Sequence, residues 1–228
     1  MKPSVNQTPG MSSIHCIHCG RDNASGMRAC QYCGKALAAV KKERGLRRLI
    51  MKSIMRILLL TLVLLFLGYA SLITTSDPIP FDQQRQVAKA IEIIEKRGFS
   101  KEAFVLGRLV RYRSTDNWWN RHNGHESAYA ATNFPFEVVT LYPQFFDDSV
   151  DDVERAAILL HESYHLFGYG EPGAFEGTWK DRIQLGWTKE HYNNTAVWIS
   201  VTESTVRWAP QLFTCGDDGK SDCTERRK

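Results

Sequence analysis

The stretch HESYHLFGYGE, residues 161–171, contains two histidines four residues apart and a glutamate directly after the first. In a helix, side chains four residues apart lie on the same face, so His161 and His165 would present their imidazoles to one point. This spacing suits a zinc ion, and Glu162 could reach a water molecule at that point as a general base. The same letters also occur by chance on ordinary amphipathic helices, so the surrounding sequence has to support a metal site.

Four cysteines near the N-terminus form a second set with metal-ligand spacing. Cys16 and Cys19 make one C-x2-C pair, Cys30 and Cys33 make another, and a glycine follows each pair. Two such pairs can close a tetrahedral thiolate site around zinc. In a reducing cytoplasm, metal binding by the thiolates is favoured over two disulfides. Residues 14–35 therefore resemble the zinc-ribbon family, which implies a structural zinc and an interaction or sensing module whose partner stays unknown.

The other two cysteines, Cys215 and Cys223, lie near the C-terminus in the sequence CGDDGKSDC. The residues between them are rich in glycine and aspartate, which is typical of a short surface loop. If this segment lies in an oxidising compartment, the two thiols can pair across the loop. We therefore predict a surface hairpin closed by a disulfide.

An apolar stretch separates the ribbon from the rest of the chain. No charged residue occurs between Arg56 and Asp77, and no polar face recurs at helical spacing. Residues 54–73 are long enough to cross roughly 30 Å of hydrocarbon. We predict a single transmembrane helix over 54–73, preceded by a basic juxtamembrane linker over 36–53.

The distribution of charge predicts the orientation of this helix. Residues 1–56 contain 11 basic and 2 acidic residues, a net charge of +9, whereas the remainder contains 18 basic and 23 acidic residues, a net charge of −5. By the positive-inside rule, the N-terminus lies in the cytoplasm and residues 77–228 lie outside the cell membrane. A cleaved signal peptide is the alternative, but about 55 residues precede the apolar stretch, far more than a signal peptide's basic region.

The external region, residues 81–228, has the patterns of an α+β domain. Apolar periodicity predicts helices over 81–98, over 149–168, from about 172 onward and over 188–208; strands are expected over 103–113 and 136–146. A polar loop with two tryptophans, residues 114–127, should join the strands. Ser149 and Asp152 resemble a capping box at the start of the helix that carries the two histidines, and Gly168 is suited to end it.

Residues 134–176 resemble the zincin superfamily of metallopeptidases through the H-E-x-x-H motif on its helix and the strand before it. The resemblance implies a zincin-like domain over 81–228, after a small zinc ribbon and one transmembrane helix. It also implies that the strand before the metal helix lies at a sheet edge and pairs with an extended peptide substrate. The sequence FEVVTLYP, residues 136–143, is positioned to do this by strand addition.

A zinc site of this kind needs a third protein ligand and one open position. Glu171 stands ten residues after His161, where the metzincin pattern H-E-x-x-H-x-x-G-x-x-H has its last histidine, and Gly168 matches the glycine of that pattern. Metzincins also have a methionine turn further along the chain. No methionine follows Met55 here, which excludes the full metzincin pattern.

The gluzincin branch of the superfamily uses a glutamate as its third ligand, with a small residue three positions later. Glu171 and Ala174 fit this arrangement, although Glu171 follows His165 at a shorter spacing than is usual for gluzincins. We therefore prefer Glu171 as the third ligand, and Glu176 stays as the alternative.

The resemblance implies metal-assisted hydrolysis of peptide bonds. With zinc held by His161, His165 and Glu171, water becomes acidic enough for Glu162 to take its proton during attack on an amide carbonyl. The oxyanion needs a further donor, and the sequence does not choose among Tyr169, His191, Tyr192, His122 and His125.

The function predicted from the sequence is that of a membrane-anchored zinc metallopeptidase that acts on peptide or protein substrates. Two other classes of protein fit the same motifs. One is a non-proteolytic zinc hydrolase on the same scaffold. The other is a membrane-anchored binding or sensing protein whose zincin-like domain is inactive, although an intact Glu162 counts against it.

Overall fold

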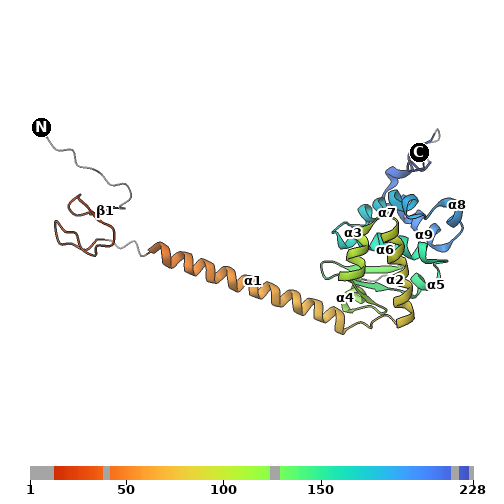
Figure 1. Ribbon diagram of the computed structural model, residues 1–228, viewed down its shortest axis with the longest axis horizontal. Coiled ribbons are helices and arrows are strands. Elements are labelled where there is room, and N and C mark those ends of the chain that lie inside the picture. Colours follow the sequence, from red (N-terminus) through yellow and green to blue (C-terminus); the bar gives the residue numbers. More distant parts are fainter. Residues whose placement is uncertain (1–12, 38–41, 124–128, 217–220, 226–228) are drawn as a thin grey trace. The chain divides into compact units, whose positions relative to one another are not determined.

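The computed structural model describes residues 13–37, 42–123, 129–216 and 221–225 (Figure 1). The chain forms two compact units, Met1–Leu64 and Leu65–Lys228, and each is described by itself. The described residues have a mixed α+β structure that is mostly helical, with two small sheets.

The first unit contains the cysteine-rich segment. Strands β1 (Ser13–His15) and β2 (Asp22–Ala24) pair as an antiparallel hairpin. The buried side chains of this segment come mainly from Cys16, Cys30 and Leu37. A core this small supplies little hydrophobic stabilisation, so a bound metal would have to contribute most of the folding free energy.

Helix α1 (Lys42–Thr74) runs through the apolar stretch. From Arg47 to Thr74 it is long and apolar enough to cross a membrane, the one such helix within the described ranges. Its large apolar side chains between Ile57 and Leu67 are exposed. Such a surface is unfavourable in water and suits a lipid environment.

After the end of α1, the second unit continues with α2 (Phe81–Lys96), as predicted. The segment after α2 differs from the prediction. The expected strand over 103–113 is wrong for most of its length: α3 (Ser100–Phe104) and a π-helical turn, η1 (Val105–Leu109), precede a short strand β3 (Arg111–Arg113). The buried residues here are Ala103, Leu106 and Val110, spaced three and four apart. Burial at helical spacing overrides the strand propensity of the individual residues.

A three-stranded sheet has the order β3-β5-β4, formed with β4 (Ala130–Asn133) and β5 (Val138–Leu141). Strand β5 is parallel to β3 and antiparallel to β4, and all four of its residues are buried. The strand expected over 136–146 is shorter because Pro143 starts α5 (Pro143–Asp147). The expected edge position is also wrong, because β5 is central and β4 takes the edge.

The predicted polar loop over 114–127 contains one short helix, α4 (Trp118–Asn123), and its residues 124–127 lie outside the described ranges. The helix predicted over 149–168 is α6 (Asp152–Leu166). The expected cap is wrong: the carboxylate of Asp151, not Ser149, accepts hydrogen bonds from the first backbone N–H groups of α6. Helix α7 (Glu171–Leu185) follows with Pro172 in its first turn, as predicted.

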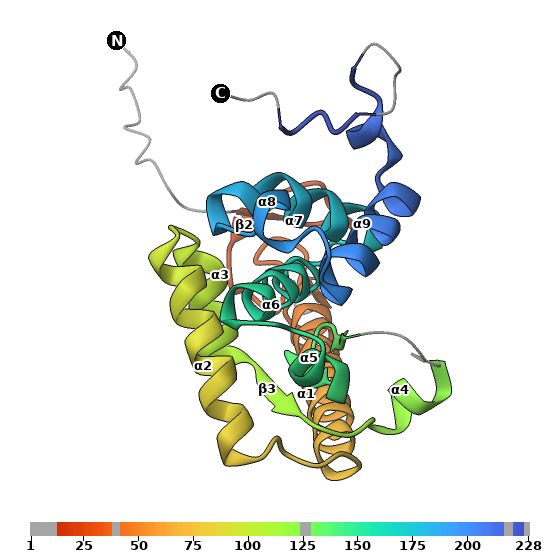
Figure 2. The same ribbon diagram turned by 90° about the vertical axis from the view of Figure 1, so that its right-hand side faces the viewer.

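The last predicted helix is divided into α8 (Lys189–Tyr192) and α9 (Ala196–Trp208), with a 3-10 turn, η2 (Pro210–Phe213), after them. Helix α6 packs against α2 and against α7, and α9 packs against α7 (Figure 2). The shared core includes Val87, Ile94, Val139, Leu159, Trp179 and Trp187. This core fixes α6 and α7 relative to each other.

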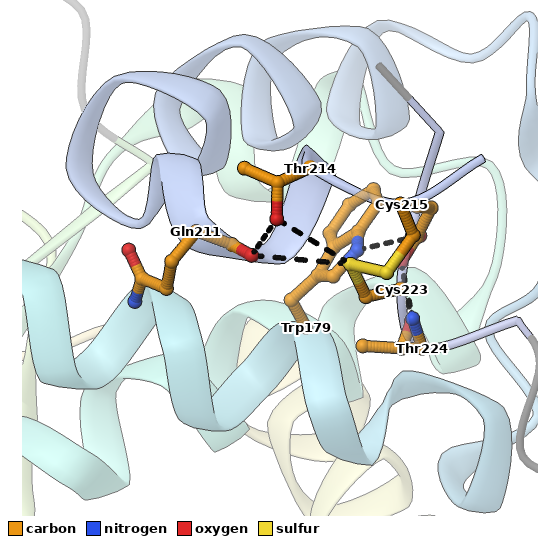
Figure 3. The surroundings of a disulfide bond; sticks show 7 residues. Trp179, Gln211, Thr214, Cys215, Cys223 and Thr224 are labelled. Atoms are coloured by element: carbon orange, nitrogen blue, oxygen red, sulfur yellow. Dashed lines mark hydrogen bonds between the residues drawn. A yellow bond between two sulfur atoms is a disulfide. The ribbon is translucent and has the colours of Figure 1, made fainter. Parts of the chain in front are cut away.

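The C-terminal segment is attached to α7 beside a disulfide between Cys215 and Cys223, which confirms the predicted pairing (Figure 3). Asp222 accepts hydrogen bonds from the indole of Trp179 at 2.8 Å and from the guanidinium of Arg182 at 2.7 Å. Arg182 is only 1% exposed. The disulfide-closed loop therefore provides the counter-ion of a buried cation on α7.

Candidate metal centres

The four cysteine sulfurs of the first unit lie within 4.8 Å of one another. Cys16 and Cys33 have their sulfurs 3.7 Å apart, and those of Cys19 and Cys30 are 3.5 Å apart. In a tetrahedral site with zinc–sulfur bonds of about 2.3 Å, neighbouring sulfurs are about 3.8 Å apart. The cluster therefore has the dimensions of a four-thiolate metal site.

Two copies of the same turn aim the thiolates inward. In each, a glycine with a φ of about +70° donates its N–H to the carbonyl of the pair's first cysteine: Gly20 to Cys16 and Gly34 to Cys30, both at 2.8 Å. This left-handed conformation is strained for residues with a side chain, which explains the glycine after each pair.

Two thiols of this cluster have pKa values that are shifted in opposite directions, so these two do not ionise together. A backbone hydrogen bond with Arg21 lowers the pKa of Cys19, but desolvation and the neighbouring thiols outweigh it and raise that pKa to about 12. Burial raises the pKa of Cys30, but hydrogen bonds from the N–H groups of Tyr32 and Cys33 outweigh it and lower that pKa to about 6. A divalent cation would remove this conflict by stabilising all four thiolates.

In the second unit, His161 and His165 on α6 converge with Glu171, the first residue of α7. Their Nε2 atoms are 3.1 Å apart, and the Glu171 carboxylate oxygens lie 3.5 Å from Nε2 of His161 and 3.6 Å from that of His165. Ligands about 2.05 Å from a tetrahedral zinc are about 3.3 Å apart. These three donors therefore form a triangle of the right size for one zinc ion.

Close packing of α6 and α7 brings these ligands together. Gly168, with φ of +84°, ends α6 and lets the chain turn back. Further along α7, Gly177 lies against the ring of Tyr164 so closely that an added Cβ would be 2.6 Å from it. The Tyr164 hydroxyl also donates to Asp181 of α7. The site thus depends on a helix contact that only a residue without a side chain permits.

Hydrogen bonding orients the ring of His165. Its Nδ1 lies 2.9 Å from the backbone carbonyl of Tyr169, so Nδ1 is the protonated nitrogen and Nε2 is left for a metal. His161 packs on the ring of Phe175, with ring centroids 4.4 Å apart. Its Nδ1 is buried and has no hydrogen-bond partner within the part of the chain that the structure describes.

Electrostatics favour a cation between these groups. The hydrogen bonds with His161 and His165 hold the pKa of Glu171 well below its usual range. Burial lowers the pKa of His165, but its hydrogen bond with Glu171 and the charge of Glu162 outweigh burial and raise that pKa to about 9. A metal ion at this point would replace a proton, as is usual for histidine ligands.

Glu162 lies beside the ligand triangle and is only 5% exposed. Its Oε2 accepts a hydrogen bond from the hydroxyl of Thr132, on the edge strand β4, at 2.6 Å. Thr132 carries no signal in the sequence, because it precedes Glu162 by 30 residues in a strand without a clear pattern. The pairing of β4 with β5 brings it to the site.

These side chains line a cleft of about 610 Å³. Strand β4 forms one wall of the cleft. Its register with β5 determines which of its backbone N–H and C=O groups point away from the sheet. The N–H of Tyr142 donates to the carbonyl of Tyr129 at 3.0 Å, so in the antiparallel alternation Ala130 and Thr132 direct their backbone groups away from β5. These groups are available for pairing with an extended chain.

The other candidate residues lie in different surroundings. Glu176 forms an ion pair with Lys180 instead of meeting the histidines. Among the oxyanion candidates, Tyr169 lines the cleft. The Tyr192 hydroxyl donates to Asp151 at the start of α6, and His191 lies 3.1 Å from the hydroxyl of Thr188. His122 is in α4, and His125 lies outside the described residues.

The structure thus brings together His161, Glu162, His165 and Glu171 in one cleft, and the four cysteines in another cluster. Comparisons of the chain with protein-family models, with curated protein sequences and with solved structures found no match. The functional conclusion therefore rests on the chemistry of these two groups of residues.

Proposed function

We propose that this protein is a membrane-anchored zinc metallopeptidase. The observation that carries the proposal is the triangle of two Nε2 atoms and a carboxylate, with a second, nearly buried carboxylate, Glu162, beside it. A structural zinc site has no need of a separate base, whereas a hydrolytic site requires one. The arrangement is therefore the one expected for hydrolysis.

His161, His165 and Glu171 would hold the zinc ion, which is consistent with their spacing of 3.1 to 3.6 Å. When bound, zinc supplies the Lewis acidity that makes water a nucleophile near neutral pH and polarises a carbonyl group.

Glu162 acts as the general base of this mechanism. Its carboxylate takes a proton from the attacking water as the new carbon–oxygen bond forms, and passes it to the amine nitrogen as the carbon–nitrogen bond breaks. Thr132 donates to one carboxylate oxygen and so fixes the orientation of the other. Among the described oxyanion candidates, Tyr169 is the one that lines the same cleft, and it is the donor that we propose for the oxyanion.

The edge of β4 favours peptides as substrates. An extended peptide could add to this edge through the backbone groups of Ala130 and Thr132, next to the catalytic carboxylate. Strand β4 would thereby take the role that the sequence analysis assigned to residues 136–143.

The rest of the chain anchors this domain. Helix α1 would span the cell membrane once, with its basic flank in the cytoplasm. The Cys215–Cys223 disulfide suits an oxidising exterior, and the four free thiols suit a reducing interior. The cysteine cluster would hold a structural zinc and act as an interaction module whose partner is not assigned.

The experiment compares the full-length chain in detergent micelles with the variant Glu162→Gln, using a peptide library and mass spectrometry to detect cleavage. The variant keeps the shape of the side chain but cannot accept the proton, so hydrolysis should fall roughly 10²–10⁴-fold while zinc per mole stays constant. Near-normal hydrolysis by this variant would show that the mechanism is wrong.

The same measurements separate the alternatives. Hydrolysis of small esters or amides without peptide cleavage would identify a non-proteolytic zinc hydrolase. Zinc in the cysteine cluster alone, with no hydrolysis, would indicate a binding or sensing protein. For a metal site on α6, His161→Ala should lose one zinc per chain together with activity.

A further inference from the structure

The last turns of α1 belong to the second unit and pack against the rest of it along one face of the helix. Gly68, Ser71 and Thr75 recur at helical spacing and share this face. Phe136 packs on Gly68, where an added Cβ would lie 3.0 Å from its ring. The indole N–H of Trp118 donates to the Ser71 hydroxyl at 3.0 Å, and its backbone N–H donates to the Thr75 hydroxyl at 3.2 Å.

Two guanidinium groups satisfy the carbonyl end of this helix. Arg113 donates to the carbonyl of Ile73 at 2.7 Å and to the hydroxyl of Ser76 at 2.9 Å. Arg121 donates to the carbonyl of Thr75 at 3.4 Å. Cations at a helix C-terminus are favourable because the last carbonyls lack partners within the helix. Helix α1 therefore enters the domain through a set of fixed contacts, with α4 beside its end (Figure 1).

The length of the apolar stretch sets the depth of these contacts in the membrane. Twenty residues lie between Arg56 and Asp77, which at 1.5 Å per residue span about 30 Å, the thickness of the hydrocarbon core. The stretch is therefore just long enough to cross this core. Gly68, eight residues before its last residue, lies about 12 Å before the outer end of the span. Phe136 contacts Gly68 and Trp118 contacts Ser71, so both side chains lie at the depth of the outer part of the membrane.

Several exposed aromatic side chains lie close to these contacts with the last turns of α1. Trp118 is 45% exposed, Trp119 is 53% exposed and Phe134 is 59% exposed. We call these three residues and Phe136 the aromatic face. Tryptophan is enriched at membrane–water interfaces, where its ring is buried among acyl chains and its N–H finds a polar partner. Continuity with a membrane-spanning helix identifies lipid as what covers this face.

One residue of the aromatic face, Phe134, also lines the catalytic cleft. Phe136, two residues later, touches α1. Two residues of chain span at most about 7 Å. One wall of the cleft therefore lies beside the last turns of α1.

We propose that the aromatic face lies in the outer part of the membrane that α1 crosses, among the headgroup ends of the acyl chains, and that it holds the catalytic cleft at the bilayer surface. The substrates are accordingly segments of other membrane-anchored proteins that lie close to this surface. This inference rests on the proposed function for its substrate class, and on α1 as a membrane anchor for its geometry.

The first experiment measures tryptophan fluorescence of the full-length chain in vesicles that contain lipids brominated near the headgroup end of their acyl chains. Trp119 has an indole N–H without a hydrogen-bond partner among the described residues, so Trp119→Phe should not disturb the fold. The control is Trp208→Phe, because Trp208 is 44% exposed and lines the cleft from α9 but is not part of the aromatic face. Bromolipid quenching should fall in Trp119→Phe and persist in Trp208→Phe. Equal quenching of wild type and Trp119→Phe would overturn the proposal.

The second experiment compares one peptide sequence in two forms, free in solution and attached to a lipid in the vesicles. The wild-type chain should cleave the attached form roughly tenfold faster, because the surface raises its effective concentration at the cleft. Trp119→Ser should reduce this preference and leave cleavage of the free peptide unchanged. Equal rates for both forms in the wild type would overturn the substrate class.

The outcomes also distinguish this inference from the proposed function. If neither peptide is cleaved and lipid quenching is still seen, the proposed hydrolysis fails and the membrane contact stands. If alkaline carbonate extracts the protein from membranes, α1 is not an anchor and the inference falls with it. If the chain cleaves free peptide but shows no quenching, only the inference falls.

Discussion

The cysteine cluster and the His161 site use different ways to gather metal ligands. The four cysteines lie within 18 consecutive residues, on two copies of one turn, and share a very small core. The candidate ligands of the other site come from α6 and α7, and the proposed base, Glu162, accepts a hydrogen bond from Thr132 of β4. In the cysteine-rich segment, metal binding would have to supply most of the folding free energy. In the domain, a packed core holds the candidate ligands in place before any metal binds. The cysteine-rich segment would thus need its metal in order to fold, whereas the larger domain would fold first and bind its metal afterwards.

Removal of metal should separate the two regions most strongly. A strong chelator added to the full-length chain should unfold residues 13–37, because structural zinc contributes about 10–16 kcal/mol to such modules. The domain over 65–228 should stay folded and lose only activity. Limited proteolysis with mass spectrometry measures both, as new cleavage sites inside the cysteine-rich segment and none in the domain. The comparison would be contradicted if the cysteine-rich segment resisted protease after metal removal, or if the domain unfolded together with that segment.

Replacement of single carboxylates tests which element completes the second site. Glu171→Gln should lower zinc affinity at His161 and His165 by more than the roughly 10–100-fold that removal of a supporting residue costs. Glu176→Gln is the matched control, because Glu176 pairs with Lys180 on the same helix and should leave zinc binding unchanged. Zinc titration with a competing chelator gives both affinities. The reverse result would assign the ligand to Glu176.

The contact between α6 and α7 can be widened at one position. Gly177→Ala places a methyl group against the ring of Tyr164 and should destabilise the domain by about 1–3 kcal/mol, the usual cost of overpacking. The control is Gly107→Ala, whose added Cβ would meet Ile91 at an ordinary 3.6 Å. Thermal unfolding measures the difference, and zinc affinity should fall along with stability in Gly177→Ala. Equal stability of the two variants would mean that the helices can move apart freely.

The smallest effect is expected at the strand that supports the base. Thr132→Val removes the hydroxyl that donates to Glu162 and should lower kcat roughly tenfold, since a hydrogen bond to a charged group contributes about 1.5 kcal/mol. Thr132→Ser keeps the hydroxyl and should restore most of the rate. Zinc content should be the same in all three proteins. If serine does not restore the rate, Thr132 acts through packing alone.

Much of the helical part of the fold could be predicted from the sequence, because its signals are local. The periodicity of 81–98 and of 149–168 predicted α2 and α6, and Pro172 predicted the start of α7. The spacing of the cysteines predicted the four-thiolate cluster for the same reason. Each of these patterns falls within a few turns of chain.

The strands and the support of Glu162 depend on contacts between distant parts of the chain. Residues 103–113 contain good strand formers, yet burial of Ala103 and Leu106 against the helices makes most of this segment helical. The sequence AATN of β4 has little strand propensity, and it becomes a strand because β5 pairs with it. No local pattern could therefore place Thr132 beside Glu162.

The disulfide-closed loop at the C-terminus has a consequence for the order in which the protein matures. Asp222 pairs with Arg182, which lies 40 residues earlier on the helix that also begins with Glu171. A ribosome makes the chain from its N-terminus, so α7 is complete long before its counter-ion exists. Until then the guanidinium of Arg182 has to stay hydrated, because a buried unpaired cation is costly. We therefore expect the final docking of α7, and with it the arrangement of the candidate site around His161, only after the segment that carries Asp222 has been made.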